Sequence, residues 1–155
     1  MQTYYLCPMW IDLGYLGLFL ASFLAATILP FSSEFVLSGI LAAGGDPVLS
    51  LATATLGNWL GGLTSFWIGW IGKFEWIEKY LRIPQSKLER WHRKVEGKEW
   101  WISLFCWLPG VGDIIAVILG LLKSNFWVSA TGMLVGKALR YVVWGLVTLE
   151  VIERL

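Results

Sequence analysis

The sequence predicts an all-α polytopic membrane protein, and three features of its composition support that fold class. Apolar residues make up 57% of the chain and charged residues 15%, with a mean hydropathy of +0.65. A soluble domain of this length would expose large apolar patches at this composition, which argues against a soluble fold. Eleven tryptophans lie mostly beside or inside apolar runs, as in the aromatic belts of membrane proteins. We expect residues 1–155 to form a single membrane domain.

The first predicted element is a helical hairpin around Pro30. Its arms are the apolar stretches Leu13–Leu29 and Phe35–Ala43. The second arm is too short to cross, because a spanning helix needs about 20 residues for about 30 Å of hydrocarbon. The hairpin is therefore predicted to be re-entrant, with a non-helical tip that is buried in protein or faces water. The first arm is also compatible with spanning, and both arrangements stay open.

A long apolar stretch and a polar linker follow. The stretch Val48–Ile71 carries no charge and is long enough to cross the bilayer. The linker, residues 73–99, is predicted to be a pair of amphipathic helices that lie in the membrane interface. Docking of a partner or an anionic lipid is the alternative role for the linker.

The second half of the chain holds another predicted hairpin and another long helix. The short stretches Trp100–Leu108 and Ile114–Leu122 flank Pro109 and Gly110. The final stretch, Phe126–Leu149, is long enough to span and contains two basic residues.

Both halves show the same features in the same order. Each has a proline turn, an acid four residues later at the start of a short apolar helix, and a long helix with a G-x-x-x-G pair, a motif typical of close helix packing. Because a hairpin does not cross and the long helix does, we predict an inverted repeat, as in secondary transporters. The members are Pro30, Glu34, Gly57 and Gly61 in repeat 1 (about 13–72) and Pro109, Asp113, Gly132 and Gly136 in repeat 2 (about 100–150).

The distribution of basic residues predicts the orientation. Arg154 falls on one side of the membrane in this topology, and the bases of the linker side fall on the other. By the positive-inside rule the linker is cytoplasmic and both termini are outside, in a multi-pass protein of the inner (plasma) membrane. The linker-side bases are Lys73, Lys79, Arg82, Lys87, Arg90, Arg93, Lys94, Lys98 and Lys123.

Four ionisable residues lie at predicted membrane depth: Glu34, Asp113, Lys137 and Arg140. Each costs at least about 2.5–3.5 kcal/mol at a helix centre, so such residues usually face a cavity or one another. Their charges sum to zero, which favours mutual pairing. We predict that they line a polar cavity that binds a substrate or an ion, together with Asn58.

The chemistry of this set favours an anionic lipid as the partner. Arg140 and Lys137 would complement a lipid phosphate, and a buried carboxylate favours its protonated form, which allows proton coupling. We therefore predict a flippase-like transporter whose partners are anionic lipids and protons, in a chain that could form a homo-oligomer and binds no nucleic acid. A non-transporting scaffold with a structural charge network is the alternative.

An enzyme is the third hypothesis, and the sequence argues against it. The chain has no nucleophile–base pair and no metal-spaced ligand set, and its single histidine, His92, lies in the polar linker. We expect no cofactor and no metal site.

The hairpins and long helices resemble the DedA family, also called the VTT or SNARE-associated superfamily, and its short YqaA-type branch in particular. The resemblance covers about Leu16–Val147, and it is carried by LASFLAATILPFSSEFVL, TATLGNWLGG, WLPGVGDIIAVILG and GKALRYV. It implies two re-entrant hairpins, an inverted repeat and a role in lipid translocation. Family members are linked to lipid scrambling, recycling of the polyprenyl-phosphate carrier and proton-dependent envelope homeostasis.

The resemblance also bears on individual residues. The family's hairpin glutamate matches Glu34, and a second acid twelve residues on matches Asp46, for which a turn role is the alternative. Larger members carry an arginine on each side of the second Pro-Gly, where this chain has Cys106 and Gly112. The basic partner must then come from elsewhere, and Arg140 and Lys137 are the candidates.

Overall fold

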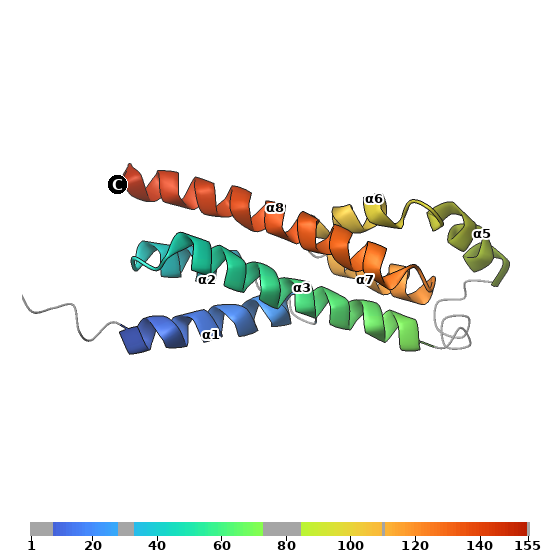
Figure 1. The fold of residues 1–155 in the computed structure, drawn as a ribbon, viewed down its shortest axis with the longest axis horizontal. Helices are drawn as coiled ribbons and strands as arrows, with labels where there is room; N and C mark the ends of the chain where they lie inside the picture. The colour runs from blue at the N-terminus through green and yellow to red at the C-terminus, as the bar shows by residue number, and fades with distance from the viewer. Residues whose placement is uncertain (1–7, 28–32, 73–84, 110, 155) are drawn as a thin grey trace, which may run out of the picture. The chain divides into compact units, whose positions relative to one another are not determined.

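The computed structural model describes residues 8–27, 33–72, 85–109 and 111–154, and these form helices joined by short connections (Figure 1). An all-helical fold is thereby confirmed for the described residues. The elements in chain order are α1 (Pro8–Ala25), α2 (Ser33–Ala42), α3 (Pro47–Ile71), α5 (Gln85–Val95), α6 (Glu99–Leu104), η1 (Phe105–Trp107), α7 (Val111–Leu121) and α8 (Phe126–Glu153).

Several helix ends differ from the predicted ones. The described part of α1 includes Pro8 and so extends N-terminal to the predicted start at Leu13. α7 begins at Val111 rather than Ile114, and α8 continues to Glu153 rather than Leu149. The predicted turn residues Pro30 and Gly110 lie outside the described residues.

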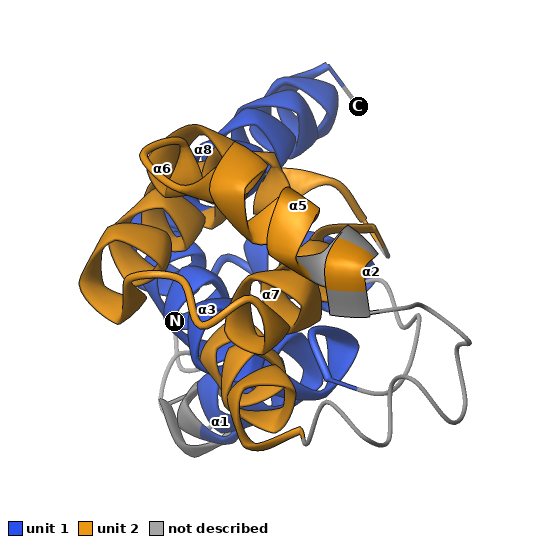
Figure 2. Cartoon of the chain, turned by 90° about the vertical axis from the view of Figure 1, so that its right-hand side faces the viewer, with its two compact units in different colours: residues 1–61, 138–155 blue, residues 62–137 orange. Residues whose placement is uncertain are grey.

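The chain divides into two compact units, coloured separately in Figure 2. Unit 1 comprises residues 1–61 and 138–155, and unit 2 comprises residues 62–137. The division cuts both long helices: α3 after Gly61 and α8 after Lys137. Each unit therefore holds one predicted hairpin, the first part of the long helix that follows it, and the last part of the other long helix.

Unit 1 packs its two hairpin arms against the two long helices. Its core consists of Leu18 from α1, Leu37 and Leu41 from α2, Ala54 from α3 and Tyr141 from α8. All are almost or completely buried, as expected for close-packed helices.

The G-x-x-x-G pair of α3 lies against the first arm of this hairpin. A Cβ at Gly57 would clash with the carbonyl oxygen of Phe19, and one at Gly61 with that of Phe23. The absent side chains let the α3 backbone approach the α1 backbone, which is the packing that small residues permit in membranes.

Unit 2 shows the corresponding contact between α8 and α6. A Cβ at Gly136 would clash with the carbonyl oxygen of Leu104, and one at Gly132 with the hydroxyl of Ser103. The second arm of this hairpin, α7, approaches α3 just as closely: Gly120 lies against the carbonyl of Phe66, and Gly69 against that of Val117.

Among the described residues, α8 is the helix whose length and hydropathy qualify it to cross a membrane. α3 has 25 residues and no charge, as the sequence predicts, but its threonines, Asn58 and glycines lower its hydropathy. α2 and α7, with 10 and 11 residues, are both too short to span.

Candidate functional site

In unit 1, the acid at the start of α2 forms an ion pair with a base of α8. Glu34 lies in the first turn of α2, and its Oε1 accepts a hydrogen bond from the Nη2 of Arg140. The Glu34 side chain is 9% exposed and that of Arg140 is 18% exposed. The carboxylate also lies at the N-terminal end of α2, where the helix dipole favours a negative charge.

The second oxygen of this carboxylate is in a different situation. Among the described residues, no donor reaches the buried Oε2 of Glu34. A buried acceptor without a partner costs about 1–3 kcal/mol, more for a charged group. Within the described part of the chain, this oxygen therefore has lone pairs that a proton or a hydrogen-bond donor can occupy.

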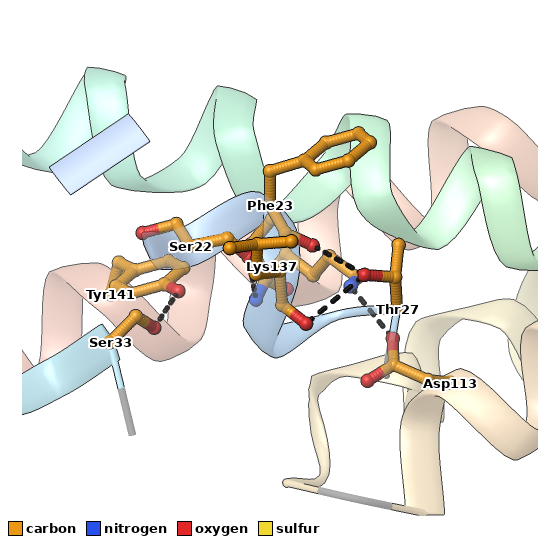
Figure 3. Close-up of polar contacts among 9 residues, drawn as sticks. Ser22, Phe23, Thr27, Ser33, Asp113, Lys137 and Tyr141 are labelled. Carbon is orange, nitrogen blue, oxygen red and sulfur yellow. Dashed lines mark hydrogen bonds and ion pairs between the residues drawn. The ribbon is translucent and has the colours of Figure 1, made fainter. Parts of the chain in front are cut away.

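A buried hydrogen bond fixes the geometry next to this ion pair. The hydroxyls of Ser33 and Tyr141 lie 2.6 Å apart (Figure 3). Ser33 directly precedes Glu34 in the sequence, and Tyr141 directly follows Arg140. The guanidinium of Arg140 lies 5.9 Å from the Tyr141 ring centroid, within cation–π range. The first turn of α2 is thus attached to α8 at two adjacent points.

In unit 2, the corresponding acid pairs with the other base of α8. The Nζ of Lys137 donates to Oδ1 of Asp113, in the first turn of α7, over 3.2 Å (Figure 3). The Lys137 side chain is 2% exposed, whereas that of Asp113 is 25% exposed. A Cβ at Gly62 would lie 3.0 Å from the Nζ of Lys137, so this glycine leaves room for the end of the lysine side chain.

The structure thus brings the four predicted charges together as Glu34 with Arg140 and Asp113 with Lys137. Each pair is neutral, and each has one member that is appreciably exposed: Arg140 in unit 1 and Asp113 in unit 2. Buried charges are stable only when paired, so any ligand that enters must replace one partner by a group of the same charge. An anion could replace a carboxylate beside Arg140.

The remaining predicted site residues have structural contacts. Nδ2 of Asn58 donates to the carbonyl of Ser22 over 3.1 Å and so joins α3 to α1. Asp46 is exposed, and its Oδ1 accepts from the backbone N–H of Leu49 over 2.7 Å. Asp46 is therefore the N-cap of α3, directly before Pro47, in agreement with the turn role and not with a place at an ion pair.

Sequence reasoning missed a set of uncharged polar residues that joins α2 to α8. Nε1 of Trp144 donates to the Oγ of Ser38 over 3.0 Å, and Ser38 and Thr148 share a hydrogen bond of 3.1 Å. The available signal was spacing: Ser38 follows Glu34 by four residues, and Trp144 and Thr148 follow Arg140 by four and eight, so each series lies on one helix face.

Comparisons with known proteins show which proteins the chain is similar to. The VTT domain matches residues 9–149. The inner membrane protein YqaA of Escherichia coli is 35% identical over 146 residues, which are 89% of this chain and 93% of YqaA. An uncharacterized protein of Haemophilus influenzae is 34% identical over 81% of each chain.

A more distant relative is longer than this chain. The uncharacterized membrane protein YkoX of Bacillus subtilis is 32% identical over 131 residues, which are 77% of this chain and 58% of YkoX. No solved structure matches the chain.

Proposed function

Because this chain belongs to the VTT-domain family, as its resemblance to the DedA family predicted, we propose that it is a flippase-like transporter of an anionic lipid, coupled to protons. The membership supports a membrane location. The substrate class we propose is a lipid with a phosphate head group, such as a polyprenyl phosphate or a phospholipid. The protein acts by binding and release, without enzymatic chemistry.

The observation that carries the proposal is the pairing of each short-helix acid with a base of α8. Arg140 pairs with the Glu34 carboxylate, and its side chain is 18% exposed. A phosphate matches the donor fork of a guanidinium as well as a carboxylate does. A head group can therefore take the place of Glu34 on Arg140, because the positive charge of the guanidinium keeps a negatively charged partner.

Proton coupling follows from the charge balance of that exchange. When a phosphate replaces the carboxylate on Arg140, Glu34 keeps its negative charge in an apolar surrounding. Uptake of a proton at Oε2, which has no donor among the described residues, restores neutrality. Release of the head group returns the carboxylate to Arg140 and frees the proton.

We extend the proposal to topology. The two hairpins are re-entrant, the two units are inverted repeats, residues 73–99 are cytoplasmic and both termini are outside. Matching contacts in the two units support this arrangement: each long helix places its glycine pair on the first arm of the preceding hairpin, and each second arm holds an acid paired to α8. Cysteine labelling from each side of the membrane tests it.

The transport assay uses purified protein in liposomes with fluorescent phosphatidylglycerol. Dithionite added outside bleaches the outer leaflet, so transport appears as bleaching of lipid that began inside. We expect Glu34→Gln and Arg140→Ala to lower the initial rate by about tenfold or more, since a hydrogen bond to a charged group contributes about 1.5–3 kcal/mol. Imposing a proton gradient should change the wild-type rate and leave Glu34→Gln unaffected.

The control is Arg154→Ala, which breaks an exposed pair with Glu150 on the same helix and should transport normally. No transport by the wild type, or equal rates for wild type and Arg140→Ala, would refute the proposal. The alternative is a scaffold whose charges are only structural. It predicts that exchanging the charges of Glu34 and Arg140 restores folding without any further defect, and that cysteines at residues 33 and 34 remain inaccessible to water-soluble reagents.

A further inference from the structure

We propose that Ser38, Trp144 and Thr148 form a head-group track, a row of hydrogen-bond donors along which a phosphate head group moves between Arg140 and the outer end of α8. This inference rests on the proposed function, because it assigns a path to the same substrate.

The track continues directly from the ion pair. On α2, Ser38 follows Glu34 by four residues, and on α8, Trp144 and Thr148 follow Arg140 by four and eight. Residues four apart lie on the same helix face, so the polar side chains form a row. From residue 140 to 148 the row rises about 12 Å along the axis of α8, at 1.5 Å per residue.

The row lies beside the core of unit 1 and not within it. The core face of α2 holds Leu37 and Leu41, whereas Ser38 is half-buried. On α8, Tyr141 is buried, while Thr148 is half-buried and Trp144 is 42% exposed. A ligand can therefore reach the row without opening the core.

These groups stabilise one another in the absence of a ligand. Trp144 donates to Ser38 over 3.0 Å, and Ser38 and Thr148 lie 3.1 Å apart. Polar groups at membrane depth need such partners, because lipid offers none. Each hydroxyl still has unused hydrogen-bonding capacity, since it carries one proton and two lone pairs.

The chemistry favours a phosphate over a proton as the moving species. An indole N–H donates but cannot accept, so Trp144 cannot relay a proton. Two hydroxyls and one indole present donors, which suit the oxygens of a phosphate. Arg140 at the inner end supplies a full positive charge, so the track leads an anion to its binding partner.

The first test measures transport of fluorescent phosphatidylglycerol by single variants in liposomes. Ser38→Ala, Trp144→Phe and Thr148→Val should each lower the initial rate by about fivefold, the effect of one net hydrogen bond of about 1 kcal/mol. Thr131→Val is the control, because Thr131 is exposed on the same helix and its hydroxyl bonds to the carbonyls of Trp127 and Val128. It should transport at the wild-type rate.

The second test compares one variant before and after chemical modification, so a difference in folding between variants cannot produce the effect. Thr148→Cys, with Cys7→Ser and Cys106→Ala, is treated with the anionic thiol reagent MTSES on both sides of the membrane. We expect modification to stop transport, and glycerol phosphate to slow the modification, because both occupy the track. Thr131→Cys treated in the same way should keep its transport rate.

The outcomes separate this inference from the proposed function. One outcome is that the wild type transports lipid, Glu34→Gln does not, and modified Thr148→Cys transports at the full rate. That outcome overturns the track and leaves the proposed function standing. Absence of wild-type transport overturns both. Unchanged rates in Ser38→Ala and Trp144→Phe also overturn the track.

Discussion

Removing the two members of the Asp113–Lys137 pair should have unequal effects on stability. The Lys137 side chain is 2% exposed, whereas that of Asp113 is 25% exposed. Asp113→Asn takes the negative charge away from a deeply buried ammonium group. Lys137→Met takes the positive charge away from a carboxylate that is partly exposed and lies at the N-terminal end of α7, where the helix dipole favours it.

The expected magnitudes follow from burial. Breaking a buried ion pair costs about 3–5 kcal/mol, mostly through the uncompensated charge. Asp113→Asn should approach that range. Lys137→Met should cost less, about 1–3 kcal/mol. The carboxylate of Asp113, which remains charged in this variant, is better solvated, and the methionine fills the volume of the lysine stem. The double variant replaces both charges and should be more stable than Asp113→Asn alone.

The assay is a double-mutant cycle, in which the free energy of unfolding is measured by denaturant titration of the protein in detergent micelles. We expect a coupling energy of about 2 kcal/mol or more for Asp113 with Lys137. The exposed pair Glu150–Arg154, with side chains 64% and 75% exposed, is the control and should couple by no more than about 0.5 kcal/mol. Equal costs of the two single variants, or equal coupling in both pairs, would refute the assignment of charge burial.

Three further predictions concern packing, positioning and capping. Gly57→Ala should destabilise by about 1–3 kcal/mol, because its Cβ would clash with the carbonyl of Phe19, whereas Gly17→Ala, with open space at its Cβ, should be neutral or stabilising in the same titration. Ser33→Ala and Tyr141→Phe should each cost about 1–2 kcal/mol, and the double variant should cost no more than the sum, which a second cycle measures. Asp46→Ala should lower stability by about 1 kcal/mol through loss of the α3 cap and leave lipid transport unchanged; a transport defect without a stability defect would return Asp46 to the site.

Much of the fold follows from residue patterns that are visible in the sequence. Uncharged apolar runs give the helices, and Asp46-Pro47 gives the start of α3 through a cap followed by proline at the first helical position. The start of α7 could not be predicted in this way. Gly112 lies within α7, and a Cβ there would clash with the carbonyl of Cys106 in η1. This close contact between α7 and η1 is a property of the tertiary packing.

The charged residues of the site were predictable and their partners were not. Burial cost and charge balance identify Glu34, Asp113, Lys137 and Arg140, because each is expensive at membrane depth. Charge balance alone is equally consistent with Glu34 pairing with Lys137 and with Glu34 pairing with Arg140. The pairing depends on which part of α8 each short helix contacts, and that is a property of the three-dimensional packing.

The hydroxyl groups beside the charges were harder still. Ser33, Ser38, Tyr141 and Thr148 occur in apolar helices, where an isolated serine or threonine hydroxyl usually bonds to its own helix, as Thr131 does. What distinguishes the first four is a partner on another helix. Spacing indicates which polar residues share a helix face, but it does not indicate which residue of another helix they contact.

Each long helix contributes residues to both units, so neither predicted repeat contains all of its own contacts. The predicted repeat 1, about residues 13–72, contains Glu34 but not Arg140, which lies on α8. The predicted repeat 2, about residues 100–150, contains α7 but not α3, against whose backbone Gly120 lies. Repeat 1 alone would leave the Glu34 carboxylate without its base, which costs several kcal/mol in an apolar medium. Repeat 2 alone would lack the close contact between α7 and α3. Neither repeat is therefore complete as a folding unit, and the long helices α3 and α8 make the two mutually dependent.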